Sequence, residues 1–244
     1  MDLIKIKDIY SSPSYNSKIV IAGWVRAFRG NRFIELNDGS TIKNIQCVIS
    51  DSDKEIENYK KISVGSSLKI KGNLIESIGK GQSFEVEILD LEILGESDPE
   101  TYPIQPKRHS FEFLREQAHL RIRTSTFSAV MRIRSKLAYA VHKFFNEIGF
   151  NYIHTPIITS SDAEGAGEMF QVTTLDNTKI DKKELNYTED FFGKKTSLTV
   201  SGQLEAETYA LGLGNVYTFG PTFRAENSNT VSYTHLTLPT KRIV

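Results

Sequence analysis

Cysteine is almost absent from this sequence, which contains Cys47 and no other among its 244 residues. One cysteine cannot form an internal disulfide, and it cannot supply the several thiolates of a cysteine-based zinc site. No apolar run approaches the roughly 20 residues of a membrane-spanning helix, and the N-terminal segment 1–10 lacks the long apolar core of a signal peptide. We therefore expect a cytoplasmic protein with no membrane partner.

An excess of charge of one sign is also lacking, because 30 Lys and Arg balance 30 Asp and Glu. A neutral total argues against a protein that coats nucleic acid with its whole surface, but it leaves room for a local basic face. The hydrophobic content of 39% is ordinary for a globular protein. The length allows one large domain, or a small domain followed by a larger piece.

The first hundred residues contain five short stretches with the alternation or apolar character of strands. A charged, helix-compatible segment lies between the third and the fourth, and turn signals such as Asn37-Asp38-Gly39-Ser40 separate others. This order predicts a five-stranded Greek-key barrel of the OB type. The expected strands are 18–26, 32–37, 44–49, 67–75 and 84–94, and the helix-compatible segment is 51–62.

The alternation also assigns faces to the expected strands. Ile34 and Leu36 point into the barrel, so Phe33 points outward, as does Gln46 on the next strand. OB barrels often bind single-stranded nucleic acid by stacking bases on exposed aromatic rings. Phe33 is therefore a candidate for stacking, although it could instead cap the end of the core. The amide of Gln46 could recognise a base edge.

Basic residues accompany this face and the segment that follows the barrel. Arginines at 26, 29 and 32 could contact phosphates, or they could form an ordinary solvated rim. Prolines and charges cluster after residue 97, which indicates a linker. Its five basic side chains could touch an RNA backbone, but a solvated connector explains them as well. These five are Lys107, Arg108, Arg115, Arg121 and Arg123.

The second part of the chain begins with the clearest helical pattern. Apolar residues recur at three- and four-residue steps over 125–149, Thr124 or Ser125 can cap the start, and Gly149 ends the run. A β-rich piece follows, with Pro156 in its middle, which places this strand at a sheet edge or an interface.

A loop at 160–169 and two further stretches carry polar side chains. The loop contains Glu164 among three carboxylates that could surround an ammonium group, or that could be plain surface charges. A strand at 196–200 leads into a helix with Gln203 at its start. Tyr217–Asn227 is expected to be a strand that Gly220-Pro221 breaks in the middle and that ends in Arg224 and Glu226, which alone would be a simple ion pair.

Taken together, these motifs resemble a known family. GFNYIHTPIIT, EGAGEMF, SGQLEAE and FRAE occur in this order, after HLRIRT at 119–124. This combination resembles the class II aminoacyl-tRNA synthetases of the aspartyl/asparaginyl subgroup, specifically the N-terminal half of the asparaginyl enzymes. The resemblance implies an α+β fold, with an OB-fold anticodon-binding domain at 1–97, a hinge at 98–123 and part of a catalytic domain at 124–230. The catalytic part would be an antiparallel sheet flanked by helices.

The resemblance also implies partners and roles. L-asparagine, ATP with Mg²⁺, and tRNA(Asn) would be bound. The helix at 125–149 with GFNYIHTPIIT resembles the family's motif 1, which would form a homodimer interface that includes Pro156. FRAE resembles the first half of the family's motif 2. The roles that it implies for individual residues are carboxylate and α-phosphate binding by Arg224, ATP or Mg²⁺ binding by Glu226, amino-acid binding by Glu164 and Gln203, and anticodon recognition by Phe33 and Gln46.

Selectivity for asparagine depends on one position in this comparison. The related aspartyl enzymes carry a lysine three residues after the glutamine that matches Gln203, and Ala206 stands there in this sequence. Without that cation a neutral amide fits better than a carboxylate. The alternatives are a nondiscriminating aspartyl enzyme, a tRNA-binding OB module without catalysis, and an asparagine synthetase paralogue.

The family pattern stops near residue 230. Residues 231–244 do not fit the second strand of motif 2, and motif 3 with its ATP-binding arginine does not occur. We therefore expect 231–244 to be a non-native tail, and the chain to be a truncated fragment that does not activate asparagine by itself.

Overall fold

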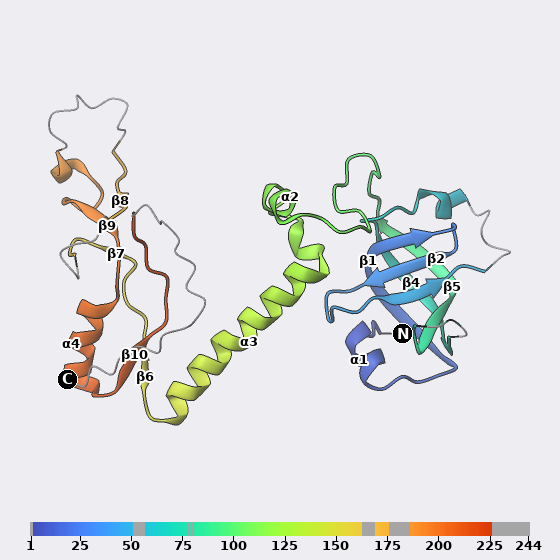
Figure 1. Ribbon diagram of the computed structural model, residues 1–244, viewed down its shortest axis with the longest axis horizontal. Helices are drawn as coiled ribbons and strands as arrows, with labels where there is room; N and C mark the ends of the chain where they lie inside the picture. Colours follow the sequence, from blue (N-terminus) through green and yellow to red (C-terminus); the bar gives the residue numbers. More distant parts are fainter. Residues whose placement is uncertain are drawn as a thin grey trace. The chain divides into compact units, whose positions relative to one another are not determined.

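The computed structural model describes residues 2–50, 57–77, 79, 81–162, 169–175 and 186–225, apart from the side chains of residues 57 and 58. The chain divides into two compact units, Met1–Lys136 and Leu137–Val244. Each unit is described by itself below, and Figure 1 gives the element labels. The domain bounds 1–97, 98–123 and 124–230 remain predictions.

The first unit is built around a closed five-stranded barrel, as the alternation predicts (Figure 1). Neighbouring strands are antiparallel except β3 and β5, which are parallel. The 3₁₀ turn η1 (Glu57–Lys61) lies between the third and the fourth strand. Around the barrel the order is β1-β2-β3-β5-β4, with β1 at Ser17–Arg29, β2 at Phe33–Asn37, β3 at Ile45–Val48, β4 at Ser67–Glu76 and β5 at Phe84–Gly95.

Branched aliphatic side chains fill the barrel. Ile21, Ile34, Leu36 and Ile70 are each fully buried, and for Ile34 and Leu36 this agrees with the inward face assigned from alternation. Cys47 belongs to the same core, where burial raises the pKa of its thiol. This cysteine is therefore a packing residue with little thiolate character.

The short helix α1 (Ile6–Ser11) packs against the barrel and was not predicted from the sequence. Ile6 and Ile9 are buried in the barrel core, and the backbone N–H of Ile6 donates to Asp38 Oδ2 at 2.8 Å. A helix this short is unstable alone. Its formation therefore depends on these two contacts with the barrel.

Two helices and a 3₁₀ turn follow the barrel: α2 (Phe111–Glu116), η2 (Arg121–Arg123) and α3 (Ser125–Glu147). The Oγ of Ser110 caps α2 by accepting from the N–H of Phe113, and Thr124 Oγ1 accepts from the N–H of Phe127 at the start of α3. Gly149, at a φ of 84°, follows the end of α3. The predicted helix 125–149 is confirmed, two residues shorter.

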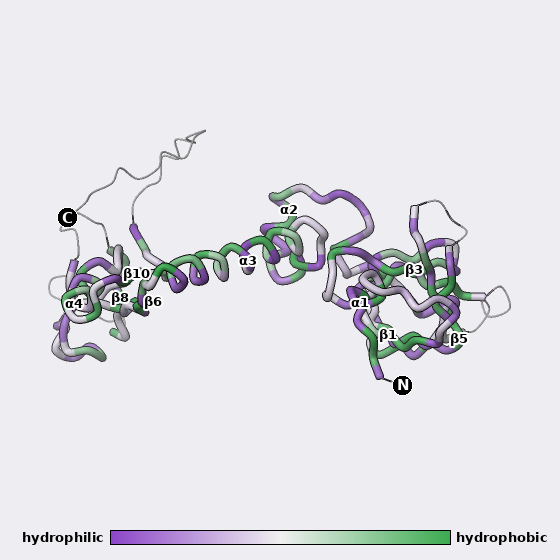
Figure 2. Tube along the Cα trace, turned by 90° about the horizontal axis from the view of Figure 1, so that it is seen from below, coloured by the Kyte–Doolittle hydropathy of each residue, from purple (hydrophilic) through white to green (hydrophobic). Residues whose placement is uncertain are grey.

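Many large apolar residues of α3 are exposed on this chain, and the others are half-buried. Figure 2 shows hydrophobic and hydrophilic residues alternating along the helix. Val130, Ile133 and Phe144 are 42%, 58% and 57% exposed, and no residue of α3 is buried. No helix in the described part of the chain is long and apolar enough to cross a membrane.

The second unit contains short strands and one further helix. β7 (Ile158–Thr159), β9 (Thr196–Leu198) and β8 (Gln171–Val172) form an antiparallel sheet in that order. β10 (Val216–Thr218) pairs in parallel with β6 (Asn151–Ile153). The remaining elements are η3 (Tyr187–Glu189) and α4 (Gln203–Leu213). The expected strand at 196–200 is confirmed, two residues shorter, and so is the helix after it.

Asp190 connects two segments of the second unit. Its Oδ1 accepts from the N–H and the hydroxyl of Thr174, at 2.9 and 2.8 Å, and from the N–H of Phe191 at 2.8 Å. The N–H of Thr174 is the main cause that lowers the pKa of Asp190 to about 2, because these bonds favour the charged carboxylate.

Candidate nucleic-acid interface and active site

Phe33 lies on the outer face of the barrel, where the alternation predicts it. It begins β2 and pairs with Val48 of β3, while its neighbour Ile34 points into the core. The ring is half-buried, and the guanidinium of Arg32 lies 5.4 Å from its centre. An aromatic ring on this face, next to a cation, has the character of a base-stacking position.

Gln46 faces the same side of the sheet, two register positions along. It pairs with Glu35 across β2 and β3, and Glu35 is two residues from Phe33 on the same face. Nε2 of Gln46 donates to Glu85 Oε2 at 3.0 Å, and the same oxygen accepts from Ser77 and Gln82. Within the described residues nothing donates to Gln46 Oε1, which leaves this carbonyl oxygen available as an acceptor.

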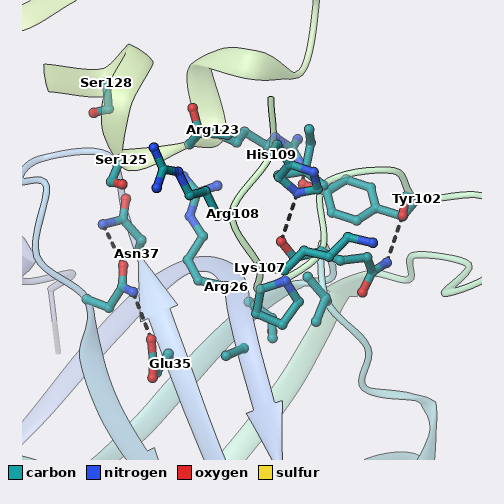
Figure 3. A pocket seen from close by; sticks show the side chains of 18 of the residues that line it. Arg26, Glu35, Asn37, Tyr102, Lys107, Arg108, His109, Arg123, Ser125 and Ser128 are labelled. Carbon is teal, nitrogen blue, oxygen red and sulfur yellow. Dashed lines mark hydrogen bonds between the residues drawn. The ribbon is translucent and has the colours of Figure 1, made fainter. Parts of the chain in front are cut away.

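A basic cleft adjoins this face within the first unit (Figure 3). Its walls come from β1, β2, the segment 102–109 and the start of α3. Arg26 and Arg29 were predicted as possible phosphate contacts or a solvated rim, and the basic hinge residues that include Arg123 as possible contacts with an RNA backbone or a solvated connector. The contacts of Trp24 and Tyr102 with Arg123 were not predicted. The basic residues of β1 and of the hinge were the available signal for this cleft.

In the second unit, backbone hydrogen bonds join three segments that carry predicted site residues. The N–H of Thr199 donates to the carbonyl of Ile157, and the N–H of Phe223 donates to the carbonyl of Thr199, both at 2.8 Å. Phe223 directly precedes Arg224, which is exposed. The Arg224 segment is thus held beside the strand that leads to Gln203.

Gln203 begins α4 and is exposed. Its N–H donates to Ser201 Oγ at 3.1 Å, and its Nε2 donates to Glu207 Oε1 at 2.8 Å. A Cβ at Gly202 would lie 2.6 Å from the Oγ1 of Thr155, so this turn requires the absence of a side chain. The close approach fixes the start of α4 against the segment that contains Thr155.

Two strand predictions in this unit are wrong. Pro156 does not lie within a strand: β6 ends at Ile153 and β7 begins at Ile158, because proline has no N–H to donate to a ladder. The strand expected from Tyr217 is also shorter, since β10 ends at Thr218, before Gly220-Pro221. Pro156 is exposed. Its place at a dimer interface remains a prediction.

Not all predicted site residues can be placed. Glu164 and Glu226 lie outside the described residues, as does the segment 231–244. Among the residues that are described, no group of three or more His, Cys, Asp or Glu could hold a metal ion.

An aromatic cluster that the sequence analysis missed supports β10. Nδ1 of His142, in α3, forms a hydrogen bond of 2.7 Å with the hydroxyl of Tyr217. The ring of His142 also packs edge-on against the ring of Tyr152, with ring centres 4.9 Å apart. Phe145, one helical turn further on, stacks on Tyr217 with ring centres 4.6 Å apart. A polar residue at 142, within the apolar pattern of the helix, was the available signal. The cluster holds α3 against the strand that leads to Arg224.

Comparison with known families agrees with both parts of this description. Residues 19–94 match the family model described as OB-fold nucleic acid binding domain, and residues 110–236 match the model for tRNA synthetases class II (D, K and N). The chain belongs to the class II tRNA synthetases of this group, as the resemblance of its motifs predicts.

Individual relatives narrow the comparison to one kind of synthetase. The chain is 56% identical over 241 residues to the asparagine–tRNA ligase of Cytophaga hutchinsonii, covering 96% of this chain and 52% of that protein. It is 52% identical over 235 residues to the asparagine–tRNA ligase of Borreliella burgdorferi, covering 93% and 51%. The chain therefore spans about half the length of the curated relatives it matches.

Solved structures give the same result at lower identity. Asparaginyl-tRNA synthetase from Pyrococcus horikoshii, complexed with asparaginyl-adenylate, superposes with a TM-score of 0.76 at 25% identity, covering 94% of this chain and 50% of that one. The Entamoeba histolytica asparaginyl-tRNA synthetase has a TM-score of 0.74 at 24% identity, covering 96% and 50%, and shows the same fold.

Proposed function

We propose that this sequence belongs to an asparagine–tRNA ligase, which activates L-asparagine with ATP and transfers it to tRNA(Asn). The observation that carries the proposal is the backbone-linked arrangement of Ile157, Thr199 and Phe223, which brings the Arg224 segment beside the loop that begins at Ser201. The matches to asparagine–tRNA ligases over 93–96% of the chain support it.

In the first step, a carboxylate oxygen of asparagine attacks the α-phosphorus of ATP, and pyrophosphate leaves. Two negative groups must approach one another, so the barrier is largely electrostatic and orientational. The guanidinium of Arg224 supplies parallel donors for the carboxylate and the α-phosphate. It thereby neutralises charge and fixes the angle of approach. In the second step, the terminal 3′-hydroxyl of the tRNA takes the asparaginyl group from the adenylate.

In this proposal, Gln203 and Glu164 bind the amino acid. Gln203 lies at the start of α4, where its Nε2 donates a hydrogen bond to Glu207. A substrate could accept this hydrogen bond in place of Glu207. Glu164 would bind the ammonium group. Ala206, one helical turn beyond Gln203, leaves the site without the cation that an aspartate side chain would require.

The barrel would recognise the anticodon of the tRNA. Phe33 offers a half-buried ring for stacking, and Gln46 offers a carbonyl oxygen on the same face. Stacking tolerates any base, so discrimination depends on the amide of Gln46. A half-buried aromatic ring next to a half-buried amide on one outer face suits a single-stranded loop rather than a duplex.

Mg²⁺ bound with ATP would neutralise charge on the phosphates, and Glu226 is the residue that we propose to orient it. Dimer formation through motif 1 would cover the exposed apolar residues of α3, such as Ile133 and Leu137, which are 58% and 60% exposed on this chain. Pro156 would lie at that interface. We expect the protein to act in the cytoplasm.

A hybrid enzyme tests the proposed function. Residues 1–225 of this sequence, joined to the C-terminal half of the Cytophaga hutchinsonii ligase, would be assayed for ATP–pyrophosphate exchange. We expect exchange that depends on asparagine. Arg224→Lys keeps the charge but loses the two parallel donors, and it should lower the exchange rate by about 100-fold or more. Exchange that depends on aspartate, or that Arg224→Lys leaves unchanged, would contradict the proposal.

A further inference from the structure

The basic cleft of the first unit has a volume of about 570 Å³ and an unbalanced charge. One carboxylate, Glu35, lines it, and Arg29 pairs with this group at 2.6 Å. Glu35 is further occupied by Asn44, which donates to its other oxygen at 2.9 Å. Four basic side chains in the cleft then have no carboxylate partner among the described residues: Arg26, Lys107, Arg108 and Arg123.

The local backbone explains how Arg26 comes to face the cleft. Val25 pairs with Leu36 and Ala27 pairs with Glu35, so Arg26 is the additional residue of a β-bulge in β1. Val25 and Ala27 are both buried in the barrel. A bulge turns one side chain away from the regular alternation, and bulges are frequent beside binding sites.

Arg123 is held in place from two sides. Its guanidinium lies over the ring of Trp24 at 5.5 Å and over the ring of Tyr102 at 5.8 Å, and its Nη1 donates to the Tyr102 hydroxyl at 3.3 Å. These contacts restrict the rotamers of Arg123 before any ligand arrives. A cation that is already ordered loses little conformational entropy when it binds an anion.

Arg26 and Arg123 are close enough to affect one another. The pKa of Arg26 is lowered, mainly by burial and further by the positive charge of Arg123, whereas Tyr102 opposes the change. Figure 3 shows the side chains of Arg26, Arg108 and Arg123 near one another in the cleft, beside Ser125 of α3. An anion between these guanidinium groups would offset their repulsion, and its negative charge would compensate for the hydration that Arg26 loses on burial.

The cleft continues the face that carries Phe33 and Gln46. Glu35 lines the cleft, lies opposite Gln46 in register, and is two residues from Phe33 on the same side of β2. Two residues of a strand span about 7 Å. A nucleic acid whose base stacks on Phe33 therefore has its backbone within reach of the cleft.

We propose that this cleft, at Arg26, Arg108 and Arg123, binds a phosphodiester of the same RNA whose bases are held at Phe33 and Gln46. This inference rests on the proposed function for the identity of the RNA. The cleft contributes affinity without base discrimination, because phosphates carry no sequence information. The barrel face and the hinge thus form one continuous RNA-binding surface.

Binding of a tRNA(Asn) transcript to the 244-residue chain tests the proposal, with fluorescence anisotropy measured from low to moderate salt. Arg26→Gln and Arg123→Gln should each weaken binding roughly threefold to tenfold, and each should reduce the slope of log K against log salt by about 0.7–0.9. Arg115→Gln is the matched control, because this hinge arginine pairs with Glu112 and does not line the cleft.

Separate control variants distinguish a loss of RNA binding caused by misfolding from one caused by the loss of a positive charge. Arg108 is exposed and makes no described packing contact, so Arg108→Gln tests the cleft even if Arg26→Gln fails to fold. Arg26→Lys should retain most of the salt slope. If the Arg26, Arg108 and Arg123 variants all bind like Arg115→Gln, the proposal is overturned.

Two further measurements distinguish an RNA phosphodiester from free phosphate as the ligand, and distinguish failure of the cleft proposal from failure of the proposed function. Inorganic phosphate that raises the melting temperature of the wild type, with RNA affinity unchanged in the variants, would identify a free-phosphate site and overturn the RNA assignment. A transcript with a changed central anticodon base tests the proposed function instead. If the wild type binds it as well as tRNA(Asn), anticodon recognition fails, while the salt slopes still decide the role of the cleft.

Discussion

Replacing Phe33 by alanine isolates the stacking role proposed for the barrel face. Stacking of a base on an aromatic ring is worth about 1–3 kcal/mol, which corresponds to roughly a 5-fold to 150-fold loss of RNA affinity. The ring is half-buried and contacts Arg32, so its removal should also lower barrel stability by about 1 kcal/mol. The barrel core does not depend on it, because the inward residues Ile34 and Leu36 remain.

The assay is anisotropy with a fluorescent anticodon stem-loop, at fixed salt, using Phe33→Ala and Phe33→Leu. Leucine keeps the apolar bulk and loses the π face, so it should restore stability without restoring affinity. The salt slope should match the wild type, since no phosphate ligand is altered. A Phe33→Leu variant that binds the stem-loop within twofold of the wild type would refute the stacking role.

Three further predictions concern selectivity and stability. In the hybrid enzyme, Ala206→Lys should reduce asparagine-dependent pyrophosphate exchange at least about tenfold, whereas Ala206→Met, similar in length but uncharged, should reduce it less; equal losses would point to steric blocking. Gly23→Ala places a Cβ 2.6 Å from the carbonyl oxygen of Asn37 and should destabilise the barrel by about 1–3 kcal/mol in thermal unfolding; an unchanged melting temperature would contradict this. Asp190 has a lowered pKa of about 2, so its stabilisation is complete above the ordinary aspartate value and is lost as pH falls from about 4 toward 2. Asp190→Asn should make the free energy of unfolding depend less steeply on pH in that window. An unaltered pH dependence of the unfolding free energy would show that other groups control it.

The barrel was predictable because each strand buries one face. In β2 the alternation of Phe33 and Glu35 with Ile34 and Leu36 assigns both faces, and burial agrees residue by residue. Helix α3 was predictable from its three- and four-residue apolar spacing, although no residue of this helix is buried on this chain. The family resemblance depended on the order of several motifs, which no single pattern supplied.

Tertiary contacts explain what the sequence did not reveal. Helix α1 is too short to form without the barrel, which buries its isoleucines. The bulge at Arg26 follows from a register shift between β1 and β2, and no local signal marks it. Trp24, Tyr102 and Arg123 meet only because the hinge segment folds back on the barrel. The sequence marked Arg123 as a basic hinge residue, and no local pattern links it to Trp24 or Tyr102.

The strand predictions around Pro156 and after Thr218 were wrong because a proline interrupts each expected strand. Apolar and β-branched residues surround both positions, but ladder pairing requires N–H donors, and proline interrupts it in each case. The role predicted for Arg224 does not depend on that strand. It depends on the bond between Phe223 and Thr199, which holds the segment beside α4.

Charging of tRNA(Asn) by the hybrid enzyme tests the central claim most directly, because it requires the barrel and the catalytic residues together. The measurement is attachment of radiolabelled asparagine to wild-type tRNA(Asn) and to a transcript with a changed central anticodon base. We predict efficient charging of the first and at least about tenfold lower kcat/KM for the second. Equal charging of both transcripts, or attachment of aspartate in place of asparagine, would contradict the account.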